Sequence, residues 1–119
     1  GDGLDELTTT GPSRVLSLAD GSIEEFTVDP AALGLAPATR DDLRGGDPGE
    51  NADVIRRVLA GEKGPHRDIA VLNAAAGLLV GGAVADLAEG LATAGLAIDD
   101  GRAQGALDAL VRVSHAHAQ

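Results

Sequence analysis

The dipeptide Asp20-Gly21 lies between two short runs of strand-forming residues, and it constrains the first half of the chain more than any other feature. The runs are Arg14 to Leu18 and Ile23 to Val28, which are rich in leucine and β-branched side chains. Asp-Gly supplies the positive φ that a tight hairpin turn requires. The sequence therefore predicts a two-stranded antiparallel hairpin, with Glu24-Glu25 on a strand exposed at the sheet edge.

Helical patterns dominate after residue 46. The first helix is predicted to begin at Asp47-Pro48, because Asp47 can cap free N–H groups and Glu50 resembles the far end of a capping box. It is predicted to end at Gly61. Further helices are expected over residues 67–80 and 84–96, with a last helix starting near Asp99-Asp100. The segment 67–80 is apolar on nearly all sides, which predicts a buried central helix, and the tail 115–119 is expected to fray.

Three other features give local predictions. Residues 29–46 contain turn-forming Pro and Gly without sustained periodicity, which predicts a connecting segment. Gly90 either lets another backbone come close or weakens its helix. Asn73, the polar residue inside 67–80, is expected to satisfy the backbone of a neighbouring loop rather than to contact a ligand.

The apolar residues are small, since alanine supplies 22 of the 52 hydrophobic residues. Alanine buries little area, so we expect close helix packing and a domain of marginal stability on its own. The 119 residues suit one domain. The chain starts at Gly1 without an initiator methionine, and we expect it to be a piece of a longer protein.

The charge balance argues against two classes of partner. The chain has 19 acidic and 9 basic residues, for a net charge of -10, and both halves are negative. A nucleic-acid surface or a polybasic membrane surface needs the opposite sign. No run is long and apolar enough to predict a membrane span. The lack of cysteine excludes a disulfide scaffold and is compatible with a cytoplasmic protein.

The segment Gly1-Asp2-Gly3-Leu4-Asp5-Glu6 is the most informative short motif. We expect residues 1–10, which end in three threonines, to pass from the end of a strand into a ligand-facing loop. The three carboxylates of the motif repel one another unless a cation is present. Mg²⁺ prefers oxygen ligands and often bridges one or two carboxylates to substrate phosphates, so the adjacent Asp5-Glu6 pair fits a metal-diphosphate site. A solvated acidic turn is the alternative. Gly45-Gly46-Asp47 resembles part of a phosphate cradle, but helix capping explains it better.

Several motifs together resemble the C-terminal third of the anthranilate phosphoribosyltransferase family. The resemblance covers most of the chain, from Gly1 to about Leu79, and the closing residues match the family's usual ending. It rests on Gly1-Asp2-Gly3-Leu4-Asp5-Glu6-Leu7-Thr8, Leu43-Arg44-Gly45-Gly46-Asp47, Glu50-Asn51-Ala52, Val58-Leu59-Ala60-Gly61, Arg67-Asp68, Leu72-Asn73-Ala74-Ala75, Ile98-Asp99-Asp100-Gly101 and Ala106-Leu107, in that order.

The resemblance implies a reaction of tryptophan biosynthesis. The nitrogen of anthranilate displaces pyrophosphate from 5-phosphoribosyl 1-pyrophosphate, with Mg²⁺ required. In the family, the Asp-Glu pair of this motif holds the metal against the diphosphate, and these residues fall on Asp5 and Glu6. The assignment is physically sensible because a cation there stabilises the negative charge that develops on the leaving group.

The resemblance also implies a fold and an incomplete site. The fold class is α/β: the chain would be the C-terminal part of one phosphoribosyltransferase α/β domain, a hairpin followed by about four helices. The family's N-terminal helical domain, glycine-rich diphosphate loop and anthranilate-binding residues have no counterpart in residues 1–119. We therefore expect the chain alone to bind substrate weakly and to catalyse no turnover. The complete enzyme is expected to be a cytoplasmic homodimer that associates through its N-terminal helices.

Two alternatives remain open at this stage. A pyrimidine-nucleoside phosphorylase-like enzyme would share the architecture but would bind phosphate and a nucleoside. A non-catalytic binding or regulatory domain could keep the fold without the chemistry, although the retained Asp5-Glu6 pair argues against this reading.

Overall fold

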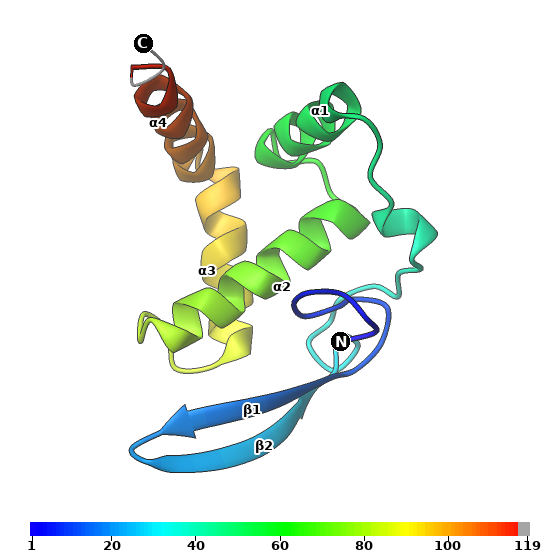
Figure 1. Ribbon diagram of the computed structural model, residues 1–119, viewed down its shortest axis with the longest axis vertical. Helices are drawn as coiled ribbons and strands as arrows, with labels where there is room; N and C mark the ends of the chain where they lie inside the picture. Colours follow the sequence, from blue (N-terminus) through cyan, green and yellow to red (C-terminus); the bar gives the residue numbers. More distant parts are fainter. Residues whose placement is uncertain (117–119) are drawn as a thin grey trace.

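The computed structural model describes residues 1–116, which form a two-stranded hairpin followed by four α-helices (Figure 1). In chain order the elements are β1 (Ser13–Ala19), β2 (Ser22–Val28), the 3-10 helix η1 (Asp41–Leu43), α1 (Pro48–Leu59), α2 (Pro65–Val80), α3 (Leu87–Asp99) and α4 (Arg102–Ala116). This order confirms the predicted hairpin and helices. Of the tail predicted to fray, residues 115 and 116 still belong to α4, and residues 117–119 lie outside the described part.

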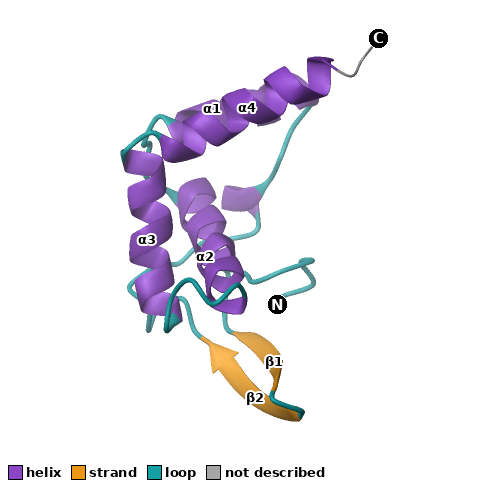
Figure 2. Cartoon of the chain, turned by 90° about the vertical axis from the view of Figure 1, so that its left-hand side faces the viewer, coloured by secondary structure: helices purple, strands orange, loops and turns teal. Residues whose placement is uncertain are grey.

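The hairpin forms around the predicted turn. β1 and β2 pair antiparallel, with Leu18 opposite Ile23. Asp20 and Gly21 have φ angles of 50° and 79°, the positive values that suit a two-residue turn to the twist of the strands. β2 is exposed along all but its last residue, as predicted from its two glutamates. The ribbon projects away from the helices (Figure 2).

Helix α1 begins with the predicted capping box. The Glu50 backbone N–H donates to the Asp47 carboxylate at 2.9 Å, and the Asp47 backbone N–H donates to the Glu50 carboxylate at 2.9 Å. Two N–H groups that the helix leaves free are thereby satisfied. The chain leaves the helix through Gly61, whose φ is 98°. The capping interpretation of Gly45-Gly46-Asp47 is therefore confirmed.

Helices α2 and α3 lie against each other and enclose the core (Figures 1 and 2). Their contact depends on Gly90 in α3, because a Cβ atom there would lie 2.8 Å from the Cβ of Ala75 in α2. Gly90 therefore allows the close backbone approach that the sequence raised as one possibility. Val71, Ala94 and Ile98 form a buried cluster at this interface.

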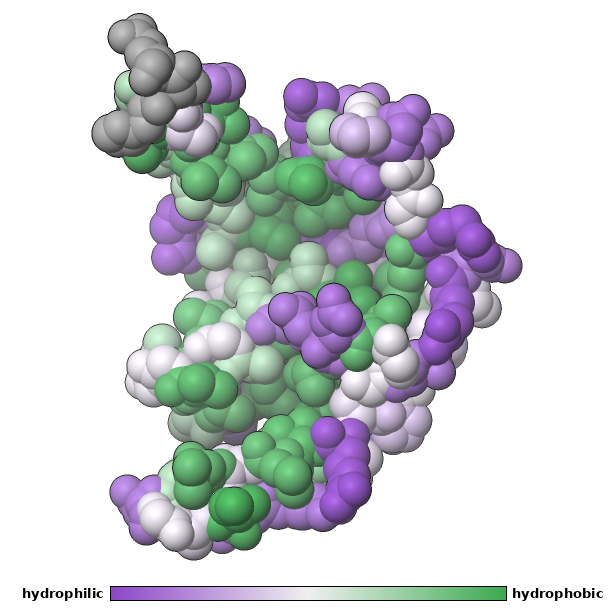
Figure 3. Space-filling model, in the orientation of Figure 1, coloured by the Kyte–Doolittle hydropathy of each residue, from purple (hydrophilic) through white to green (hydrophobic). Residues whose placement is uncertain are grey.

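Helix α2 is central, in contact with α1, α3 and η1, but it is not buried on nearly all sides, and this part of the prediction was wrong. One face packs on α3, but Ala70, Ala74 and Gly77 are exposed, and Val80 is 90% exposed. An apolar hollow of about 540 Å³ lies among the four helices and is lined by residues such as Val58, Ala74, Leu78 and Ala103. Hydrophobic side chains gather in the hollow between α1, α2 and α4 (Figure 3). The apolar pattern of the sequence did not indicate which faces of α2 have other elements packed against them.

The boundaries of the last two helices also differ from the prediction. Helix α3 begins at Leu87 rather than Val84, because the Asp86 carboxylate caps it by accepting from the Glu89 backbone N–H at 2.8 Å. It continues through Asp99, so Asp99 ends α3 and does not open the last helix. Asp100 does lie at the next helix start, where its carboxylate accepts from the Arg102 backbone N–H at 3.1 Å. Helix α4 then leaves α3 at an angle (Figure 2).

The segments outside these elements are irregular. Residues 29–46 form turns with the short helix η1, in line with the predicted connection. The expected strand end within residues 1–10 is not seen, and the segment consists of turns and bends. Among the described residues, no helix combines the length and apolar character needed to cross a bilayer.

Candidate functional site

The carboxylates of Asp5 and Glu6 lie on an exposed loop beside helix α2. They border an open hollow of about 360 Å³, which is lined by Leu4, Asp5, Glu6, Leu7, Ile69, Ala70 and Asn73. Within residues 1–116, no side chain forms an ion pair with either carboxylate. Both groups are therefore free to engage a ligand that enters the hollow.

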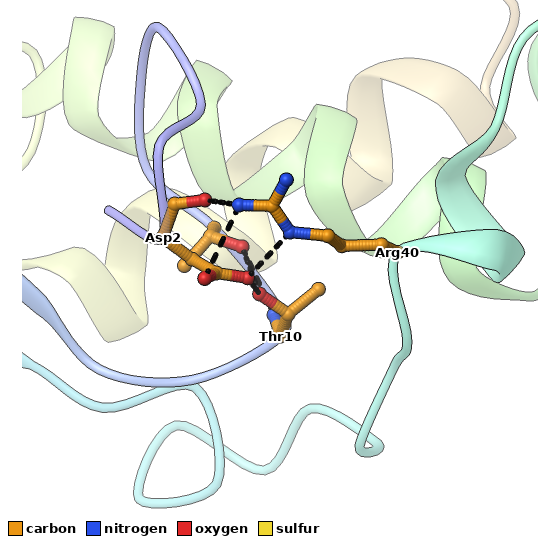
Figure 4. Close-up of polar contacts among 4 residues, drawn as sticks. Asp2, Thr10 and Arg40 are labelled. Atoms are coloured by element: carbon orange, nitrogen blue, oxygen red, sulfur yellow. Dashed lines mark hydrogen bonds and ion pairs between the residues drawn. The ribbon is translucent and has the colours of Figure 1, made fainter.

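The start of this loop is held by Asp2, Thr10 and Arg40 (Figure 4). The Thr10 hydroxyl donates to Asp2 Oδ2 at 2.6 Å, and Arg40 Nε donates to the same oxygen at 3.3 Å. Arg40 Nη2 donates to the backbone carbonyl of Asp2 and, at 3.3 Å, to Oδ1. The hydrogen bond from Thr10, followed by the hydrogen bond and charge of Arg40, lowers the pKa of Asp2 below its ordinary value. Asp2 is thus committed to the structure of the loop.

The backbone turns sharply between this anchor and the two free carboxylates. Asp2 and Gly3 both have positive φ, 52° and 72°, and the Leu4 N–H donates to the carbonyl of Gly1 at 3.0 Å. Glycine adopts such angles without steric cost, and aspartate tolerates them better than most residues. The glycine of the motif therefore shapes the loop.

The far end of the loop is held by Asn73 of helix α2. Asn73 Oδ1 accepts from the Leu7 backbone N–H at 3.0 Å, and Nδ2 donates to the Leu7 carbonyl at 3.0 Å. Nδ2 also donates to the Ile69 carbonyl one turn earlier in the helix at 3.0 Å. The prediction that Asn73 satisfies the backbone of a neighbouring loop is confirmed.

The threonines after the motif are not all ligand-facing, which corrects the expectation for this segment. Thr8 and Thr9 have 0% and 2% of their surface exposed. The Thr8 N–H donates to Ser13 Oγ at 3.2 Å, and the Thr8 hydroxyl accepts from the Thr10 N–H at 3.0 Å. These residues form a buried support beneath the loop. Sequence reasoning missed this role because exposure of a polar run depends on what covers it.

The donor set at the loop suits a shared cation and not a closed protein cage. The described residues contain no group of three or more His, Cys, Asp or Glu side chains placed to hold one metal ion. Mg²⁺ is commonly held by one or two carboxylates, with waters and substrate phosphates filling its other positions. Two exposed, adjacent carboxylates beside an open hollow fit that pattern. Arg40 and Asn73, by contrast, are occupied in holding the loop.

A second hollow lies beside the start of helix α1. Its volume is about 410 Å³, and Gly45, Gly46, Asn51 and His66 are among its lining residues. The Asn51 amide spans both polar groups of Gly46: Oδ1 accepts from its N–H at 2.8 Å, and Nδ2 donates to its carbonyl at 3.1 Å. Asn51 therefore anchors the backbone of this loop in the same way that Asn73 anchors the loop that carries Asp5 and Glu6.

Comparison with known proteins gives a consistent result. The chain is 59% identical over 115 residues to an anthranilate phosphoribosyltransferase of Methylobacterium nodulans, a match that covers 97% of this chain and 34% of the relative. It is 57% identical over 115 residues to the enzyme of the same name from Methylorubrum populi, again covering 97% of this chain and 34% of the relative. The chain thus spans about a third of the length of these curated relatives.

The fold has a counterpart among solved structures. The crystal structure of anthranilate phosphoribosyltransferase from Thermus thermophilus matches with a TM-score of 0.84 and 38% sequence identity, covering 94% of this chain and 33% of that one. The family model described as "Glycosyl transferase family, a/b domain" matches residues 1–104. The match extends beyond Leu79, where the motif resemblance becomes sparse. The chain therefore belongs to this glycosyl transferase family, as part of its a/b domain.

Proposed function

We propose that this chain is the metal- and diphosphate-binding third of an anthranilate phosphoribosyltransferase. The observation that carries the proposal is the pair of free carboxylates, Asp5 and Glu6, on a loop held at both ends. The identity to enzymes of that name, over 97% of this chain, supports the choice of reaction. In that reaction, the amine nitrogen of anthranilate forms a bond to C1 of the ribose as the bond from C1 to the diphosphate oxygen breaks.

The role of this chain in the reaction is to hold the metal ion and to orient it toward the diphosphate. Bound Mg²⁺ would supply positive charge where negative charge accumulates on the departing diphosphate. The Asp5 and Glu6 carboxylates would hold the ion, and the anchors at Asp2 and Leu7 would keep both carboxylates in place as the bond breaks. A fixed arrangement avoids the cost of reorganising the site during the reaction.

The rest of the site is proposed to come from the part of the protein not included in residues 1–119. The glycine-rich diphosphate loop and the anthranilate-binding residues are assigned to that part, so the 119-residue chain alone is expected to turn over no substrate. We likewise infer a cytoplasmic enzyme, with a homodimer formed through N-terminal helices of the complete protein.

A graft into a complete relative tests the proposal. The matching 115 residues of the Methylobacterium nodulans enzyme would be replaced by those of this chain. The fluorescence of anthranilate would then be followed with Mg²⁺ and phosphoribosyl pyrophosphate present. We expect the graft to consume anthranilate and the isolated chain not to. A folded graft that leaves anthranilate untouched would overturn the proposal, and consumption of thymidine with phosphate would favour a nucleoside phosphorylase.

Neutralising the two carboxylates in the graft tests their assignment. Asp5→Asn with Glu6→Gln is expected to lower kcat by roughly 100-fold or more, because stabilisation of the leaving group is lost. Asp20→Asn with Glu24→Gln is the matched control, since it makes the same two kinds of substitution at exposed residues of the hairpin. Equal activity of the two double variants would remove Asp5 and Glu6 from the mechanism.

A further inference from the structure

A single side chain of helix α2 fixes the loop next to the two free carboxylates. The Asn73 amide binds both polar backbone groups of Leu7, with two hydrogen bonds of 3.0 Å. Glu6 immediately precedes Leu7, and Asp5 precedes Glu6. The two residues joined by this contact lie 66 positions apart in the sequence, so the contact ties the loop to a distant element.

The orientation of this amide is determined by its surroundings. Nδ2 has two protons and donates them to the carbonyls of Leu7 and Ile69, while Oδ1 accepts from the Leu7 N–H. Rotating the amide by half a turn would bring its NH₂ group against the Leu7 N–H and its oxygen against two carbonyls. Only the observed orientation of the amide uses both N–H donors and the oxygen acceptor. Asn73 therefore holds Leu7 in a defined position, at a place in a helix where asparagine is an unfavourable residue.

The loop between the anchors has little freedom left. At one end, Asp2 is tied to Arg40 and Thr10. At the other end, Leu7 is tied to Asn73. Asp5 and Glu6 lie between these points, and Asn73 itself lines the hollow that they border.

We propose that Asn73 is a positioning residue, which orients the Asp5 and Glu6 carboxylates for a divalent cation shared with a diphosphate. This inference rests on the proposed function of the two carboxylates. Asn73 acts through the backbone of Leu7, because its amide both accepts from the Leu7 N–H and donates to the Leu7 carbonyl. Groups that orient metal ligands in this way typically contribute 10-fold to 100-fold to metal affinity or activity.

The chain offers a matched control for this proposal. Asn51 in helix α1 makes the same pair of hydrogen bonds to the N–H and carbonyl of one loop residue, Gly46. Replacing either asparagine by alanine removes an amide that spans a peptide backbone. Only Asn73 is attached to the loop that carries Asp5 and Glu6, so the two variants separate a loss of positioning from a general loss of stability.

The test measures metal binding without turnover. Mn²⁺ would be titrated into the grafted protein in the presence of pyrophosphate, and binding would be followed through the relaxation of water protons. Asn73→Ala is expected to weaken Mn²⁺ binding by about 10-fold to 100-fold, and Asn51→Ala by less than about twofold. Asn73→Gln, which keeps the amide but lengthens the side chain, is expected to recover part of the loss. Circular dichroism would verify that each variant is folded.

The outcomes distinguish this inference from the function on which it rests. Unchanged binding in Asn73→Ala, with binding lost in Asp5→Asn with Glu6→Gln, would overturn the positioning role and leave the metal site standing. Equal weakening by Asn73→Ala and Asn51→Ala would also overturn it. Unchanged binding in the carboxylate double variant would overturn the proposed function, and this inference with it. In the grafted protein, faster hydrogen exchange of the Leu7 amide in Asn73→Ala would support the anchor, and unchanged exchange would contradict it.

Discussion

Arg67 and Asp99 form a two-point ion pair that joins the start of helix α2 to the end of helix α3. Arg67 Nη1 donates to Asp99 Oδ1 at 2.8 Å, and Nη2 donates to Oδ2 at 2.9 Å. Arg67 has only 6% of its surface exposed, whereas the Asp99 side chain is 46% exposed. A carboxylate at a helix C-terminus is normally unfavourable because it faces the negative end of the helix dipole. The buried Arg67 guanidinium offsets this unfavourable interaction with the helix dipole. It also needs the Asp99 carboxylate as a partner, because an unpaired buried charge is strongly destabilising.

The Arg67–Asp99 pair predicts a loss of stability in acid. The hydrogen bond from Arg67, together with the charges of Arg67 and Lys63, lowers the pKa of Asp99 below its ordinary value of 3.8 despite partial burial. A carboxyl group with a lowered pKa stabilises the fold above its ordinary pKa, and this contribution disappears as the pH falls through the folded-state value. The free energy of unfolding of the chain should therefore decrease as the pH falls below about 4.

Urea denaturation of Asp99→Asn over this pH range checks the prediction. The variant is expected to be less stable at neutral pH and to lose less stability in acid than the unaltered chain. Asp100→Asn serves as the control because it leaves the Arg67–Asp99 contact intact. A variant at Asp99 with the same acid dependence as the unaltered chain would contradict the assignment.

Gly90→Ala is expected to destabilise the chain, although alanine normally favours a helix. The new Cβ would lie 2.8 Å from the Cβ of Ala75 and 3.0 Å from its carbonyl oxygen, so the two helices would have to move apart. Overpacking of this kind costs about 1 to 3 kcal/mol. In Gly105→Ala, no atom lies near the added Cβ, and a gain of roughly 0.5 to 1 kcal/mol is expected. Urea denaturation of both variants measures the contrast, and the same sign for both would refute it.

The face of the hairpin that carries Leu18 and Ile23 is expected to promote self-association. Leu18 and Ile23 lie opposite each other and are 71% and 69% exposed. Exposed apolar residues on a short two-stranded sheet are prone to pair with another copy. Leu18→Lys with Ile23→Glu would place an ion pair there without changing the net charge, and sedimentation velocity should then show less association.

The opposite face of the hairpin supplies the control for this comparison. Ala19→Lys with Ser22→Glu makes the same change in charge at a directly opposed pair, on the other side of the ribbon. The association of this second variant should resemble that of the unaltered chain. If both variants dissociate equally, charge rather than the apolar face controls association.

The candidate site could be predicted in part from the sequence. Asp5 and Glu6 were singled out because adjacent carboxylates beside glycine are typical of a cation shared with phosphate, and their role remains a prediction. Asn73 was correctly predicted to bind a loop backbone. Nothing in the sequence indicated that this backbone belongs to Leu7, or that Arg40 holds Asp2 from 38 positions away. Such contacts depend on how distant segments come together.

The sequence by itself determined the features whose causes lie within a few residues of one another. Asp20-Gly21 specifies the hairpin turn through its backbone preferences, and Asp47 with Glu50 specifies the start of α1 through two local hydrogen bonds. The tertiary structure alone decided which faces are covered. It brought Asp99 to Arg67, which lies 32 positions away in the sequence, and buried Thr8 beneath the loop that carries Asp5 and Glu6. It also left one apolar side of α2 exposed, because burial depends on which elements are present to pack and not on hydrophobicity alone.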